Sequence, residues 1–115
     1  MQVTMCPERA TMEHITSKWG VLVLQVLSDG GSWRFSALRR ELEDVVSEKM
    51  LTQTLRTLER DGFMHRDVRP VIPPHVEYVL TPLGKGAARH LVALAHWIEA
   101  NQPEVSQAQQ RYDNS

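Results

Sequence analysis

The chain has 115 residues, of which 42% are hydrophobic and 23% charged, and these values favour one globular domain over residues 1–115 rather than a disordered chain. The formal net charge of −1 excludes a strongly basic polypeptide, so any contact with nucleic acid requires charges sorted onto one face. The single cysteine, Cys6, excludes an intramolecular disulfide and a multi-cysteine zinc site. No apolar run approaches the ~18 residues of a membrane span, and no signal segment is recognisable, so we expect a cytoplasmic protein without a membrane partner.

Two helices are predicted before residue 30. Proline at the first helical position pre-sets the backbone, so Cys6-Pro7 predicts a helix from Pro7 to about Ile15. In the second helix apolar residues recur at i, i+3, i+4, i+7 and i+8, and the pair Gly30-Gly31 ends it. These apolar residues are Trp19, Leu22, Val23, Val26 and Leu27. Their one-sided spacing predicts a core helix.

A helix-turn-helix is predicted next. Residues 33–35 are typical of a very short strand, and Ser36 is expected to cap a third helix with Leu38 and Leu42 pointing inward. Arg39, Arg40 and Glu43 then point outward. A short connection through Asp44-Val45-Val46 leads to the fourth helix, which completes the motif.

The fourth helix is specified locally at both ends. Ser47 is a good N-cap, Val46 and Leu51 occupy the positions of a hydrophobic staple, and Gly62 supplies the stop. At 3.6 residues per turn, Leu51, Leu55 and Leu58 share one side. The opposite side carries a basic and amide-bearing stripe, formed by Lys49, Thr52, Gln53, Arg56 and Arg60. This side is expected to face outward.

A β-hairpin is predicted after the fourth helix. The runs MHRDVRP and HVEYVL are strand-like, and in the second run Val76, Tyr78 and Leu80 alternate with the residues between them. Pro70, Pro73 and Pro74 cannot donate ladder hydrogen bonds, so they belong in the loop or at an exposed edge. A basic hairpin that follows such a helix is typical of the wing of small DNA-binding proteins.

The last helix begins at Thr81-Pro82 and carries two apolar faces. Leu83, Ala87, Leu91, Leu94, Trp97 and Ile98 form the first face, and Ala88, Val92 and Ala95 form the second. A domain of this size has one hydrophobic core, which can cover only one of the two faces. The second face therefore needs another partner, and a second copy of the chain is the simplest candidate. The polar tail over residues 103–115 is expected to fray.

The order of these elements is that of a winged helix-turn-helix, an α+β fold that is mostly α. The chain also resembles the HxlR-type transcriptional regulators, relatives of the MarR group, over residues 6–100. The resemblance is carried in order by CPERATMEHITSKWGVLVLQVL, WRFSALRREL, VSEKMLTQTLRTLERDGF and VIPPHVEYVLTPLGK. It is greatest to the branch linked to quinone and oxidant responses, and it implies a homodimeric DNA-binding regulator that dimerises through its first and last helices.

The fourth helix supplies the candidate base-reading residues. Lys49, Thr52, Gln53 and Arg56 are expected to contact bases and phosphates in the major groove, because Gln pairs with adenine and Arg with guanine. Ser47, at the helix N-terminus, is expected to hold a phosphate. The alternative is that the stripe is an ordinary solvated surface.

Five flanking residues are candidates for phosphate or minor-groove contacts, and they are Arg39, Arg40, Arg66, Arg69 and His75. Arg39 and Arg40 would clamp phosphates from the third helix, unless Arg39 forms a surface salt bridge with Glu43. The other three would act from the wing, unless Arg66 pairs with Asp67 or Glu77. Wing contacts of this kind position a protein on DNA without reading its sequence.

Cys6 is the candidate for redox chemistry. It lies at the start of a helix with Arg9 one turn on, which favours a thiolate, although Glu8 opposes this. The resemblance implies that a cysteine here senses oxidants or electrophiles, by bridging to its twin in the dimer or by alkylation with a quinone. The alternative is a small, inert hydrophobic residue.

Two functions remain open. The first is a homodimeric transcription factor, in particular a repressor that responds to oxidants, electrophiles or quinones and binds a pseudo-palindromic site in double-stranded DNA. The second is a winged-helix protein-interaction module that does not bind DNA. We expect no enzyme, because the chain lacks a phosphate loop, paired carboxylates and a nucleophile beside a histidine. The histidines are not spaced like metal ligands, so we expect neither a metal nor a cofactor.

Overall fold

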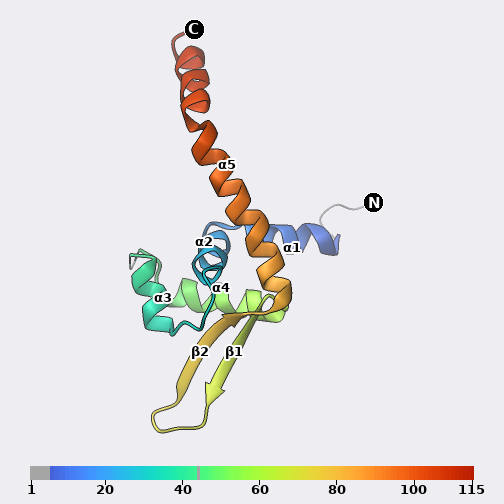
Figure 1. Cartoon of the computed structure of the whole chain (residues 1–115), viewed down its shortest axis with the longest axis vertical. Helices are drawn as coiled ribbons and strands as arrows, with labels where there is room; N and C mark the ends of the chain where they lie inside the picture. The colour runs from blue at the N-terminus through green and yellow to red at the C-terminus, as the bar shows by residue number, and fades with distance from the viewer. Residues whose placement is uncertain (1–5, 44) are drawn as a thin grey trace.

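The computed structural model describes residues 6–43 and 45–115, so Asp44 of the predicted connection lies outside the described residues. It contains five helices and one antiparallel hairpin in this part of the chain (Figure 1). In chain order they are α1 (Pro7–Thr16), α2 (Lys18–Leu27), α3 (Phe35–Glu41), α4 (Glu48–Arg60), β1 (Met64–Arg69), β2 (His75–Leu80) and α5 (Pro82–Asp113).

The core is built around α2, which contacts α1, α3, α4, α5 and β2. Val23, Leu24 and Leu27 of α2 are buried, as the apolar spacing predicted. They belong to one cluster with buried residues of the other elements, namely Leu38, Leu42, Val46, Leu51, Leu55, Leu58, Phe63, Met64, Leu80, Ala88 and Leu91. Full burial of one leucine side chain contributes about 1.5–3 kcal/mol, so this cluster holds the helices in place.

The prediction for the start of α3 was wrong. Arg34 occupies the N-cap position and Ser36 lies inside the helix, without a side-chain cap. The expected strand over 33–35 is a single bridge, in which the Trp33 and Tyr78 backbones exchange hydrogen bonds of 2.9 and 2.7 Å. Because Phe35 already adopts helical geometry, no residue is left for a longer strand.

Both predicted ends of α4 are confirmed. The Ser47 hydroxyl accepts a hydrogen bond from the Met50 N–H at 3.0 Å, which caps the first turn. At the other end Gly62 adopts a positive φ of 83° and donates to the Glu59 carbonyl, while Phe63 donates to the Leu58 carbonyl. This pair of bonds is the Schellman arrangement, which favours glycine because its φ is positive.

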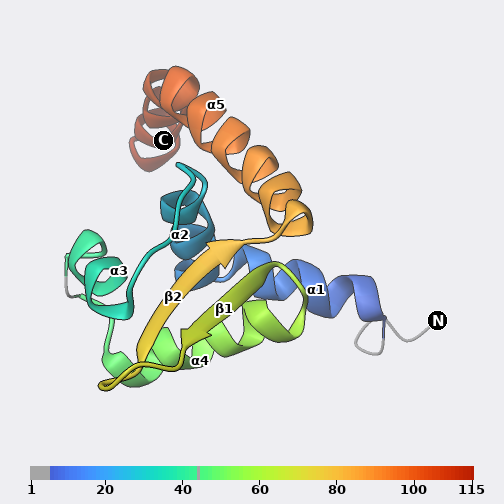
Figure 2. The same cartoon turned by 60° about the horizontal axis from the view of Figure 1, so that its bottom comes forward.

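The hairpin projects from the body beside α3 and α4 (Figures 1 and 2). β1 and β2 pair in antiparallel register from Met64 opposite Leu80 to Arg69 opposite His75. The prolines lie in the connecting loop, as predicted. The alternation expected in β2 is weak in the burial of its residues, because every residue from His75 to Val79 is half-buried.

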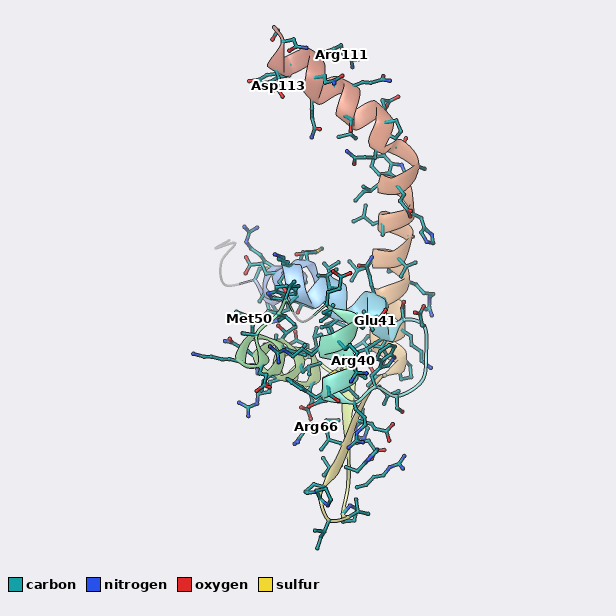
Figure 3. The ribbon with its side chains drawn as sticks, turned by 90° about the vertical axis from the view of Figure 1, so that its left-hand side faces the viewer. Arg40, Glu41, Met50, Arg66, Arg111 and Asp113 are labelled. Carbon is teal, nitrogen blue, oxygen red and sulfur yellow. The ribbon has the colours of Figure 1, made fainter. Side chains whose placement is uncertain are left out.

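The prediction that the tail frays was wrong, because α5 continues as a helix to Asp113 with Pro103 inside it. Its root is fixed by Thr81, whose hydroxyl accepts from the Gly84 N–H at 3.1 Å and donates to the Gly62 carbonyl at 2.6 Å. The second half of α5 stands away from the body as an arm that carries Arg111 and Asp113 near its tip (Figure 3). Pro103 has no N–H, so the carbonyl of the exposed Glu99 lacks its usual helical partner.

The buried side of α5 differs from the expectation. Gly84, Ala88 and Leu91 are buried. Most of the first apolar face, which was expected to pack against the core, is exposed instead. The physical reason is close approach: a Cβ on Gly84 would lie 1.9 Å from the Phe63 carbonyl oxygen, so only small residues fit there. The exposed residues, which we call the arm stripe, are Leu83, Leu94, Trp97, Ile98, Val105 and Tyr112. The arm stripe is therefore the face that needs a partner.

Candidate nucleic-acid interface

The outward side of α4 carries the predicted polar stripe. Leu51, Leu55 and Leu58 are at most 2% exposed and set the rotation of the helix. The opposite side lines an open hollow of about 470 Å³, formed by Glu48, Lys49, Thr52, Gln53 and Arg56. Within residues 6–43 and 45–115, Lys49 and Arg56 form no ion pair. These cations are therefore available to an external anion.

The two arginines of α3 differ in what they contact. Arg39 donates through Nε to the Val46 carbonyl at 3.0 Å and lies 3.5 Å from a Glu48 carboxylate oxygen. The alternative pairing of Arg39 with Glu43 is not formed, because Glu43 adopts a positive φ of 58° at the end of α3. Arg39 thus braces the turn before α4. Arg40 is exposed and has no ion pair in the part of the chain that the structure describes.

The wing arginines are held by carboxylates. Arg66 Nε lies 3.7 Å from Glu59 of α4, and not beside Asp67 or Glu77 as the alternative had it. Neighbouring residues of a strand point to opposite faces of the sheet, so the side chains of Arg66 and Asp67 lie on different faces and do not pair. Its side chain leaves the hairpin toward α4.

Glu77 organises the tip of the hairpin. Its carboxylate lies 3.3 Å from Arg69 Nη2 and 2.8 Å from His75 Nε2, while Asp67 lies 3.8 Å from Arg69 Nε. The side chain of Arg69 is 58% exposed, so an external anion such as a phosphate can reach it. The structure thus brings Arg69 and His75 together at one end of the hairpin.

Sequence reasoning missed two residues between α4 and the hairpin, Glu59 and Tyr78. Together with Thr52, Leu55, Arg56 and Arg66 they line a cavity of about 170 Å³. Burial raises the pKa of Tyr78 above its ordinary value of 10.0, although the charge of Arg66 opposes this. The hydroxyl therefore stays protonated at neutral pH. The hairpin register was the only possible signal, because it places Tyr78 opposite Arg66.

Cys6 occupies the N-cap position of α1 and is half-buried. Its Sγ donates a hydrogen bond of 2.7 Å to the Glu8 carboxylate. This bond is the main reason that the pKa of Glu8 is lowered. Cys6 lies at the end of α1 away from His14, which contacts Asp61 at the end of α4. The structure therefore does not place Cys6 among the candidate DNA contacts.

Comparison with known proteins identifies the family. Residues 14–106 match the model of the HxlR-like helix-turn-helix family. An HTH-type transcriptional regulator of Escherichia coli, YtfH, is 56% identical over 100 residues, which cover 87% of this chain and 78% of the relative.

Solved structures agree with this match. The transcriptional regulator YtfH from Salmonella typhimurium superposes with a TM-score of 0.83 at 52% identity, covering 93% of this chain and 94% of that one. The redox regulator HypR in its reduced form gives a TM-score of 0.79 at 33% identity, covering 89% and 99%. The predicted α+β winged helix-turn-helix fold is thereby confirmed.

No helix in the described ranges has both the length and the apolar character of a membrane span. The chain belongs to the HxlR-like helix-turn-helix family and is a transcriptional regulator of the winged helix-turn-helix type.

Proposed function

We propose that this regulator binds double-stranded DNA in a sequence-specific manner, with α4 in the major groove. The observation that carries the proposal is the outward side of α4, where Lys49, Gln53 and Arg56 are exposed beside the half-buried Thr52. Amide and guanidinium groups read adenine and guanine edges there, and each good bidentate pair supplies roughly 1–3 kcal/mol of discrimination. Ser47 and the first turn of α4 then receive a phosphate.

The flanking cations extend this surface. Arg40 reaches the DNA backbone beside α4, and Arg39 adds to it through the exposed third of its side chain. On the wing, Arg66, Arg69 and His75 exchange their carboxylate partners for phosphates or the minor groove. The Arg66–Glu59 contact is exposed on both sides and therefore weak in water, so its exchange costs little. Although the net charge of the chain is −1, these cations are gathered on one face, as a contact with nucleic acid requires.

The binding unit is a homodimer joined through the arm stripe of α5 and through α1. Trp97 is 60% exposed and Leu94 52% on α5, and Met12 is 58% exposed on α1. Exposed apolar side chains of this size favour a protein partner. In a two-fold dimer the same surface of each copy packs against the other, so the arm stripe of one chain can cover the arm stripe of the second. Two α4 helices related by this axis enter successive major grooves about 34–36 Å apart, so the operator is a pseudo-palindrome.

A DNase footprint on the DNA upstream of the chain's own gene tests the proposal. We expect a symmetric protected region for the wild-type protein, with loss of protection in an Arg56→Ala variant. The matched control is Arg111→Ala, which removes the same charge near the far tip of the arm (Figure 3). Absence of protection and of any retention on genomic fragments at low salt favours instead a protein-interaction module.

Regulation by oxidants and electrophiles is the second part of the proposal, and the protein acts in it as a repressor. The likeness to the redox regulator HypR supports it, together with the half-buried Cys6 at the start of α1. Because each chain has one cysteine, a disulfide requires two chains. An oxidant such as diamide takes two electrons and two protons from two Cys6 thiols, which leaves one Sγ–Sγ bond. A quinone instead adds the thiol to its ring, giving a thioether on the hydroquinone.

The same footprint, repeated with diamide and with benzoquinone, tests this part. We expect release of the wild-type protein and continued protection by Cys6→Ser. Glu8→Gln removes the carboxylate that accepts the thiol proton and opposes the thiolate, so it should respond faster than the wild type. Glu99→Gln, at an exposed position on α5, is the matched control, because it removes the same charge without releasing Arg9 from Glu13. Release of the Cys6→Ser variant at the wild-type rate would remove Cys6 as the sensor.

A further inference from the structure

A cleft separates the C-terminal end of α2 from the N-terminal half of α5. Its volume is about 630 Å³, within the range of small-molecule sites. Polar residues line it on both sides, and the small residues Ala88, Val92 and Ala93 of α5 form its apolar part. The polar residues are Ser28 and Asp29 directly after α2, and Lys85, Arg89 and His96 on α5. The small α5 residues leave this space open, because longer side chains there would close the cleft.

The lining has the character of a site for an amphipathic anion. Ala88, Val92 and Ala93 form an apolar floor on α5. Lys85 and Arg89 lie one turn apart beside this floor, and neither forms an ion pair among the residues that the structure describes. Two uncompensated cations above an apolar surface match a carboxylate or sulfonate carried by an apolar body.

Asp29 restricts the ligand further. Its carboxylate lies on the opposite side of the cleft from α5 and belongs to the α2 end, where helix carbonyls add negative charge. A second anionic group on the ligand would meet this charge. The cleft therefore favours a single negative charge, with a hydrogen-bond donor such as an N–H or a phenol toward Asp29.

The cleft remains open in a dimer formed through the arm stripe. At 3.6 residues per turn, Lys85, Arg89 and Val92 lie roughly half a turn around α5 from Leu83 and Leu94. Ala88 and Leu91, which face the core, lie between the two sides. A second copy seated on the arm stripe thus leaves the cations accessible.

The position of the cleft couples it to the arm. The root of α5 is held at Gly84 against the Phe63 carbonyl, and the cleft begins one residue later. A molecule between α2 and α5 therefore acts on the helix just beyond its anchor. We propose that this cleft binds a small monoanionic amphipathic molecule, which sets the angle of the arm to the helix-turn-helix. The effect on DNA rests on the function proposed above, whereas the binding site does not.

Anilinonaphthalene sulfonate is a suitable probe, because it has one sulfonate, an apolar body and an N–H donor. We expect the wild-type protein to bind one dye per chain by fluorescence titration. Lys85→Gln with Arg89→Gln should weaken this binding about tenfold, while Arg111→Gln leaves it unchanged. Ala93→Phe, which fills the cleft from an exposed position, should remove the site. The neutral analogue phenylnaphthylamine should bind at least about tenfold more weakly than the sulfonate.

The same titration contains the outcomes that overturn the proposal. Absence of a dye site in the wild type does so, as does equal binding by the wild type and both cleft variants. Loss of binding in Leu94→Asp alone would place the dye on the arm stripe. Because no DNA is present, failure of the proposed DNA binding leaves this result readable. Saturating dye should then change the operator affinity of the wild type but not of Ala93→Phe, and an unchanged wild-type affinity would remove the coupling to the arm.

Discussion

His14 Nδ1 lies 2.6 Å from Asp61 Oδ2, and this contact joins α1 to the C-cap residue of α4. The Asp61 side chain is only 12% exposed, and His14 is 32% exposed. The pair therefore lies between the helix proposed for dimerisation and the helix proposed to read DNA. It is a side-chain hydrogen bond between α1 and the end of α4.

Replacing His14 by Ala should lower the free energy of unfolding by about 1–3 kcal/mol, because it leaves the mostly buried Asp61 carboxylate without its partner. Urea denaturation measures this loss. Glu13→Ala is the matched control, since its contact with Arg9 is exposed and should change stability by less than about 1 kcal/mol. Equal losses in the two variants would mean that the His14 contact contributes no more than a surface pair.

Arg56→Ala should weaken operator binding by about 1–3 kcal/mol, or between about fivefold and 150-fold, because a guanidinium that reads guanine is lost. A gel-shift titration at constant salt gives the ratio. Arg111→Ala carries the same change of charge near the arm tip and should bind as the wild type does. Wild-type affinity in Arg56→Ala would exclude this residue from the interface.

The wing makes a separate prediction about salt. Arg66→Ala should reduce the slope of log affinity against log salt by about 0.9, the value for one phosphate contact. Glu59→Gln should do the opposite and raise affinity at low salt, because it frees Arg66 from a contact of 3.7 Å. Glu104→Gln, on the arm, serves as the control. An unchanged slope in both Arg66→Ala and Glu59→Gln would show that Arg66 makes no contact with DNA.

Leu94→Asp should convert the dimer to a monomer, because it places a charge in the middle of the arm stripe. Sedimentation velocity measures the change in mass. Val71→Asp is a matched control at the hairpin loop, since Val71 is 53% exposed and Leu94 52%. A monomeric wild-type protein, or a dimeric Leu94→Asp variant, would contradict the proposed dimer interface.

Tyr78 should ionise in a late phase above pH 10.0 in an alkaline spectrophotometric titration, because burial raises the pKa of its phenol. Above pH 10.0 an unfolded chain loses the phenolic proton before the folded one does, so stability should fall as the pH rises past this value. In Tyr78→Phe the late phase should disappear and this part of the pH dependence should weaken. Ionisation of Tyr78 at pH 10.0, without a late phase, would show that its hydroxyl is solvated.

The sequence alone was sufficient for α4, because each part of the prediction depends on residues close together in the chain. Ser47 caps the helix through its own first turn, Gly62 ends it through bonds to the last turn, and the leucine spacing sets its rotation. For the same reason the outward direction of Lys49, Gln53 and Arg56 followed from helical geometry. The hairpin and its proline loop were equally local.

The partners of the charged residues depended on the tertiary structure. Arg66 meets Glu59 because β1 turns back along α4, and Arg39 meets the Val46 carbonyl because the chain folds around the turn. The sequence offered nearby carboxylates as partners for both. Long side chains reach across elements, so proximity in sequence does not decide which carboxylate or carbonyl they contact.

The sequence therefore determined α2, α4 with its outward polar stripe, and the hairpin, all of which depend on local turns and caps and on the period of one element. It determined neither the start of α3 nor the extent of α5. Only the tertiary structure decided which side of α5 is buried, because both sides carry apolar residues at helical spacing. Close approach of Gly84 to the Phe63 carbonyl selected the side with small residues. That choice left Leu94 and Trp97 exposed and opened the cleft beside Lys85 and Arg89.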